Sequence, residues 1–130
     1  RFFARYMPGL EKLYSRDYAR LGGLAAATAE FVRSELGIKV PVRYSSEFGV
    51  AETSTRRLVK LCEAAGADGY LSGSGARAYL DEKIFEGAGI KVSWQSFVPR
   101  EYPQAFPGFE PDMSALDLLM NCGPESVNWL

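Results

Sequence analysis

The sequence predicts an α/β fold, namely a partial doubly wound, three-layer domain in which leading helices precede a small, mostly parallel sheet. Two observations carry this prediction. Apolar residues recur at spacings of three and four through residues 1–36, which is typical of amphipathic helices. From residue 37 onward, short apolar segments alternate with helical ones in the order strand, helix, strand, helix, strand. This order implies parallel pairing through right-handed crossovers.

The leading helices follow from the positions of apolar residues, proline and glycine. The apolar spacing predicts a helix over residues 3–14 that Pro8 and Gly9 interrupt, so we expect two short helical pieces. Asp17 is a candidate N-cap for a second helix. This helix is expected to end at Gly37, because glycine readily adopts the backbone conformation that follows a helix.

The remaining predicted elements are shorter. We expect strands over 39–45, 69–72 and 90–97, and helices over 54–65, 77–86 and 114–121. The four prolines and the aromatic residues of the segment 98–113 predict an ordered loop. We expect residues 1–130 to form a single α/β domain. Three strands make a small sheet, so we also expect upstream strands outside this chain, or a partner copy, to cover the open sheet edge.

Composition excludes several classes of protein. The 15 basic and 16 acidic residues give a net charge of −1 without a block of like charge, so we expect no binding to nucleic acid. No apolar run reaches the roughly 18 residues that span a bilayer, and the first residues lack the apolar core of a signal peptide. We therefore expect a cytoplasmic protein without a membrane partner.

The chain contains no histidine and two cysteines. The absence of histidine removes the commonest metal ligand and the usual partner of a nucleophilic serine or cysteine, so we expect no metal site. Cys62 and Cys122 lie far apart in apolar helical segments, as reduced core cysteines do. Any chemistry must then use carboxylates, arginine, lysine, tyrosine, hydroxyls or backbone amides.

The strongest candidate site follows the second predicted strand. Ser72, Gly73 and Gly75 are small residues that let backbone amides approach an anion, and Arg77 adds a fork of hydrogen-bond donors. We expect this loop to bind a phosphate or a carboxylate. The spacing resembles a dinucleotide fingerprint, but no acidic residue ends the next strand, so we expect no cofactor. The alternative is a plain tight turn that opens a helix.

Other candidates lie at the same predicted edge of the sheet, because the carboxyl ends of parallel strands meet there. Thr55 or Arg57, early in a helix, could face an anion, and Tyr79 could either pack or touch a ligand. The loop residues Tyr102 and Gln104 are expected to form a wall beside the strand ends.

Ser114 and Asp117 match a helix capping box, which is the structural alternative to a catalytic role for Asp117.

The spacings of several segments in the chain resemble those of a known family. The matching segments are Thr55-x-Arg57-Leu58, Tyr70-Leu71-Ser72-Gly73-x-Gly75-x-Arg77-x-Tyr79-Leu80, Phe85-x-x-Ala88-Gly89-Ile90, Tyr102-Pro103-Gln104, Phe109-Glu110-Pro111-x-x-Ser114-x-x-Asp117 and Asn121-Cys122-Gly123-Pro124. Over residues 37–124 this order closely resembles the C-terminal half of the WbqC-like proteins. The segment rich in His, Gln, Pro and Tyr that usually opens those proteins is missing here.

The resemblance implies a role in bacterial O-antigen or other surface-polysaccharide synthesis, with amino-acid or acyl transfer to a sugar. On this interpretation the loop from Ser72 to Arg77 holds the phosphate of a sugar nucleotide or an activated acyl donor. Four residues would line the acceptor side, with Asp117 as general base beside Tyr102, Gln104 and Asn121. Two alternatives stay open: a non-catalytic nucleotide-binding or sugar-nucleotide-binding half, and a purely structural domain.

Overall fold

A computed structural model describes all 130 residues, which divide into two compact units. The helical unit comprises Arg1–Val40 and Val98–Leu130, and the sheet unit comprises Pro41–Phe97. Helices and a small parallel sheet are both present, so the predicted α/β class is confirmed. The expectation that the whole chain acts as one domain stays a prediction.

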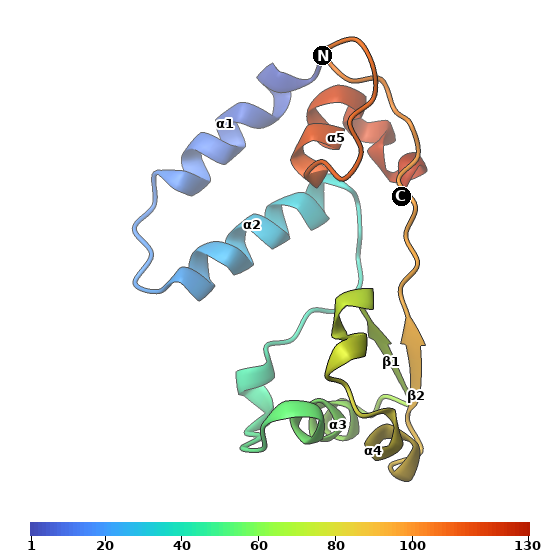
Figure 1. Ribbon diagram of the computed structural model, residues 1–130. Helices are drawn as coiled ribbons and strands as arrows, with labels where there is room; N and C mark the ends of the chain where they lie inside the picture. Colours follow the sequence, from blue (N-terminus) through green and yellow to red (C-terminus); the bar gives the residue numbers. More distant parts are fainter. The chain divides into compact units, whose positions relative to one another are not determined.

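The helical unit is built from α1 (Phe3–Tyr14), α2 (Leu21–Glu35), α5 (Ala115–Cys122) and the 3-10 helix η3 (Gly123–Trp129). Figure 1 shows α5 beside the start of α1 and the end of α2. Its core forms around the buried side chains of Tyr6, Leu36 and Leu119. The first and last segments of the chain are therefore held together by shared apolar burial.

The helix α1 runs through Pro8 without a break, so the expected division into two pieces is wrong. Tyr6, Leu10 and Leu13 are all buried on one face, on both sides of the proline. Burial of several large side chains contributes more than the roughly 3 kcal/mol that an internal proline costs a helix.

The helix α2 begins at Leu21, after Arg20, and not at Asp17. The hydroxyl of Tyr18 donates to the carbonyl oxygen of Leu13 at 3.1 Å, which ties the connecting segment back to α1. The predicted end of this helix is confirmed, because Gly37 follows it with a φ of +69°.

The sheet unit contains two parallel strands, β1 (Gly69–Ser72) and β2 (Lys91–Trp94), which lie side by side in Figure 1. Its helical elements are α3 (Ser54–Ala65), α4 (Glu82–Gly87) and the 3-10 helices η1 (Ser45–Phe48) and η2 (Ser74–Ala78). A core of Val59, Cys62, Leu80, Phe85 and Ile90 joins α3 and α4 to the strands. The parallel pairing expected from the strand and helix order is confirmed.

The expected strand over 39–45 is wrong. Residues 39–44 form no strand, Ser45 begins η1, and Val40, Val42 and Tyr44 are exposed. Pro41 lacks an amide hydrogen, which weakens any ladder through it. The alternating apolar pattern was real, but the pattern alone does not supply a partner strand.

The other boundaries differ locally. The helix expected over 77–86 is split into η2 and α4, because the side chain of Asp81 accepts a hydrogen bond from the amide of Lys83 and starts a new helix. The last helix, α5, ends at Cys122, directly before Gly123 and one residue beyond the predicted 114–121, and the 3-10 helix η3 follows it. Both cysteines are free, as expected. None of the helices combines the length and the apolar character needed to cross a bilayer.

Candidate functional site

The loop that follows residue 98 is closed by one amide side chain. The Nε2 group of Gln104 donates to the carbonyl oxygen of Glu110 at 2.9 Å, and its Oε1 accepts from the Glu110 amide at 2.8 Å. The ring of Phe109 meets that of Tyr102 edge to face, with centroids 5.4 Å apart. The prediction of an ordered loop is confirmed. Phe106 is not one of its anchors, because 84% of this side chain is exposed.

Asp117 joins this loop to α5. Its Oδ2 atom accepts a hydrogen bond from the Tyr102 hydroxyl at 2.8 Å and a longer one from Gln104 Nε2 at 3.4 Å. Its Oδ1 atom makes no hydrogen bond within the protein. The capping interpretation is correct for Ser114, whose hydroxyl accepts from the Leu116 amide, but the carboxylate of Asp117 faces the loop instead of the helix start.

Tyr102 acts here as a neutral donor. Burial raises the pKa of its phenol above the ordinary value, and the adjacent carboxylate of Asp117 raises this pKa further, although the hydrogen bond with Gln104 acts in the opposite direction. The phenol therefore stays protonated at neutral pH. Its hydrogen bond fixes one oxygen of Asp117 and leaves the other available.

A pocket of about 410 Å³ opens beside this carboxylate. It is lined by the loop from Gln104 to Glu110, by Met113 and by Asp117. Its volume lies in the range of small-molecule sites, and its walls combine aromatic and sulfur-containing side chains with carboxylates. We call it the Asp117 pocket. The pocket can hold a small polar ligand, and the carboxylate of Asp117 can accept a proton from that ligand.

Asn121 does not line this pocket. Its side chain is buried and donates to the backbone carbonyl of Asp117 at 2.9 Å, so it supports α5. It lines a separate pocket of about 390 Å³ together with Cys122 and Trp129. Burial raises the pKa of the Cys122 thiol, which disfavours the nucleophilic thiolate.

The predicted anion loop lies in the sheet unit. Ser72 is buried at the end of β1, whereas Gly73 and Gly75 are exposed, with open space where a Cβ atom would lie. Neither glycine has a positive φ. The loop therefore does not need glycine for backbone geometry, and the small residues serve only to leave the backbone accessible.

Arg77 stacks on the aromatic ring that ends β2. Its guanidinium lies over the Trp94 ring, 4.5 Å from the centroid, and the Trp94 indole donates to Glu82 at 3.2 Å. Arg77 forms no ion pair, and Asp81, four residues further along the chain, caps α4. The strand pairing explains this contact. Trp94 ends β2 and pairs with Ser72, and Ser72 begins the loop that contains Arg77.

The other candidates in the sheet unit have mostly structural contacts. The buried hydroxyl of Thr55 accepts a hydrogen bond from the Asp81 amide at 3.2 Å, and Arg57 donates to the carbonyl oxygen of Val50 at 2.7 Å. Tyr79 is 73% exposed and packs in no core. Thr55 and Arg57 thus tie their helix to neighbouring segments.

The structure groups the candidates by unit. Seven of them lie in the sheet unit: Thr55, Arg57, Ser72, Gly73, Gly75, Arg77 and Tyr79. Tyr102, Gln104, Asp117 and Asn121 lie in the helical unit. A common edge for both groups stays a prediction. Glu110 and Met113 line the pocket although neither was predicted as a site residue. The family-like segment that begins at Phe109 contains Glu110 and was the available signal, whereas no local motif marks Met113.

Two comparisons with known proteins found a match. The model of the WbqC-like protein family matches residues 1–129. The uncharacterized protein Rv1507c of Mycobacterium tuberculosis is 36% identical over 130 residues, which cover 98% of this chain and 56% of that protein. The chain thus spans little more than half the length of this relative. No solved structure matches the chain at a significant level.

Proposed function

Because the chain belongs to the WbqC-like protein family, we propose that it takes part in bacterial surface-polysaccharide synthesis by transferring an acyl or aminoacyl group to a sugar. Family membership suggests the polysaccharide context. The observation that carries the proposal of transfer is the carboxylate of Asp117, held by Tyr102 at the wall of a pocket with aromatic sides.

The Asp117 pocket suits a sugar acceptor. The faces of a sugar ring carry C–H groups that pack on aromatic side chains, which Phe106 and Phe109 supply, while its hydroxyls require a polar partner, which Asp117 supplies. The Oδ1 atom of Asp117 is unpaired and can accept a hydrogen bond from a sugar hydroxyl or amine.

In the proposed step, Asp117 takes the proton of the acceptor hydroxyl or amine while that oxygen or nitrogen attacks the acyl carbonyl carbon of the donor. A new bond from this carbon to the acceptor forms. The bond from the same carbon to the donor's phosphate or thiol leaving group breaks, and the leaving group departs with the electron pair. The proton then passes from Asp117 to solvent, which restores the carboxylate.

We assign the donor phosphate to the loop from Ser72 to Arg77. Stacking on Trp94 holds the guanidinium of Arg77 in place without using its N–H groups, and no carboxylate neutralises it. Such a preorganised fork of donors suits a phosphate. The exposed backbone at Gly73 and Gly75 lets a ligand approach closely.

Replacing Arg77 with alanine is expected to weaken binding of a phosphate-bearing ligand by about 1.5 to 3 kcal/mol, because a charge-assisted contact is lost. Thermal stability should change little, since Arg77 is exposed, forms no ion pair, and loses only a cation–π contact with Trp94 worth about 0.5 to 1 kcal/mol at an exposed site. Calorimetry with sugar nucleotides, nucleoside triphosphates and acyl-adenylate mimics measures the effect. Arg56→Ala, an exposed arginine of α3, is the matched control. Equal losses in both variants would contradict the assignment.

The acceptor assignment is tested by NMR titration of the 130-residue chain with methyl glycosides. Saturable shifts are expected for the amides of residues 104–110 and of Asp117, because these residues surround the pocket. Shifts confined to other residues, or no saturable shift with any sugar, would rule out the Asp117 pocket as the acceptor site.

The second candidate is a non-catalytic sugar-nucleotide-binding module. It is favoured by the bonding of Asp117, whose Oδ2 atom holds Tyr102 and Gln104 in place as a structural carboxylate would. This candidate forecasts ligand binding without any transferred product.

A further inference from the structure

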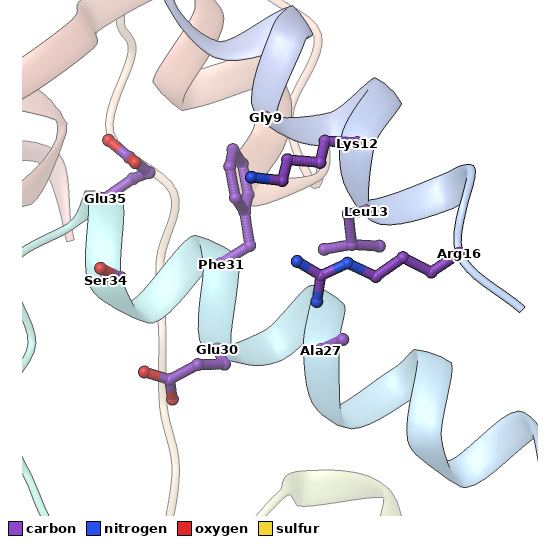
Figure 2. A pocket seen from close by; sticks show the side chains of 9 residues that line it. All are labelled: Gly9, Lys12, Leu13, Arg16, Ala27, Glu30, Phe31, Ser34 and Glu35. Carbon is purple, nitrogen blue, oxygen red and sulfur yellow. The ribbon is translucent and has the colours of Figure 1, made fainter. Parts of the chain in front are cut away.

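A third pocket, of about 370 Å³, lies between α1 and α2 in the helical unit (Figure 2). Lys12 and Leu13 line it from α1, Arg16 lines it from the segment just after α1, and Glu30, Phe31 and Glu35 line it from α2. It shares no residue with the Asp117 pocket or with the anion loop. Its use is therefore independent of the proposed transfer.

The base of this pocket is a fixed aromatic ring. A Cβ atom added to Gly9 would lie 2.7 Å from an atom of the Phe31 ring, so the missing side chain lets the ring sit against α1. Phe31 also packs against the buried core around Leu119, and Leu13 beside it is buried. The pocket thus offers a preformed apolar surface on which a flat group can pack.

Two cations face this surface. Lys12 lies in the last turn of α1, and Arg16 lies in the segment that directly follows this helix. In Figure 2 the charged ends of both side chains point toward α2. Neither forms an ion pair, and neither lies over an aromatic ring. Both retain their full donor capacity for a ligand.

The two acids of the pocket do not cancel these cations. Glu30 is bound by both N–H groups of the Arg33 fork at 2.7 and 2.8 Å, and this hydrogen bonding lowers the pKa of its carboxyl. Its charge is therefore balanced on its own helix. Figure 2 shows the carboxylates of Glu30 and Glu35 turned away from the Phe31 ring. The space next to the ring is left with an excess of positive charge.

From this arrangement we infer that the pocket between α1 and α2 binds a small organic anion. The ligand has a flat apolar body, which packs on Phe31, and a carboxylate or phosphate group, which accepts hydrogen bonds from Lys12 and Arg16. Arginine pairs with such groups through two parallel hydrogen bonds, and lysine adds a point charge. The volume of the pocket accommodates a ligand of about this size.

The test is an NMR titration of the 130-residue chain with phenyl phosphate and, separately, with benzoate. Inorganic phosphate and benzyl alcohol serve as controls that carry only the anion or only the ring. We expect saturable shifts at the amides of Lys12, Arg16 and Phe31 with one or both aromatic anions. Inorganic phosphate and benzyl alcohol should each bind at least about tenfold more weakly than the better aromatic anion. The better aromatic anion identifies the headgroup as phosphate or carboxylate.

The double variant Lys12→Gln with Arg16→Gln is expected to bind the better anion at least about tenfold more weakly than the wild type. A control variant, Arg20→Gln with Lys39→Gln, removes the same charge from exposed positions outside the pocket and should bind as the wild type does. Equal losses in the two double variants, or equal binding of phenyl phosphate and inorganic phosphate, would overturn the inference. Saturable binding to neither aromatic anion would overturn it as well.

Discussion

Replacing Asp117 with asparagine is expected to lower the rate of group transfer by about 10²- to 10⁴-fold, the usual contribution of a positioned general base. Asparagine keeps the size of the side chain and can still accept the hydrogen bond from Tyr102. It cannot take a proton from the acceptor. The melting temperature and the affinity for the acceptor sugar should therefore change little, while product formation nearly stops.

The matched control is Glu110→Gln, which removes another carboxylate from the same pocket. Glu110 contacts Gln104 through its backbone and makes no side-chain hydrogen bond, so this variant should keep the loop closed and the rate within a few-fold of wild type. A rate that falls equally in both variants would show that pocket charge, and not the base at Asp117, supports the reaction.

Replacing Phe85 with alanine is expected to destabilise the protein by about 3 to 5 kcal/mol, the usual range for truncating a buried phenylalanine. This side chain is fully buried, stacks on Tyr70 with centroids 5.0 Å apart, and joins α4 to α3 and the strands. Urea unfolding monitored by tryptophan fluorescence measures the loss, since Trp94 packs against the same core.

Phe106→Ala is the control for this experiment. The same residue type is removed, but 84% of Phe106 is exposed, so the free energy of unfolding should change by less than about 0.5 kcal/mol. Similar losses for the two variants would mean that the core around Phe85 does not hold the sheet unit together.

Elements whose signal is local were predictable from the sequence. The strand at 69–72, the helix at 54–65 and the end of α2 at Gly37 all match the structure, because apolar periodicity and glycine geometry specify them. The segment 39–45 has the same alternation as a strand but remains unpaired. Pairing depends on a partner elsewhere in the fold, which no local pattern encodes.

The candidate site was predictable residue by residue but not as a set of contacts. Tyr102, Gln104 and Asp117 were each expected in a site, yet the hydrogen bonds that join them span 13 to 15 residues and have no sequence signature. The buried hydroxyl of Thr55 bonds an amide 26 residues away, a structural role that its position in the first turn of a helix did not reveal. Side-chain partners of this kind depend on tertiary packing.

Mass spectrometry of the acceptor sugar tests the account most directly. The 130-residue chain is incubated with a methyl glycoside and, in turn, with an acyl phosphate, an acyl-adenylate and an acyl thioester of a phosphate-bearing carrier. We expect wild-type protein to add the mass of the acyl group to the sugar with at least one donor, and Asp117→Asn to do so at least about 10²-fold more slowly. The contradicting result is a sugar that stays unmodified with every donor, although the protein binds both the sugar and the donor. In that case the chain is a binding module and not a transferase.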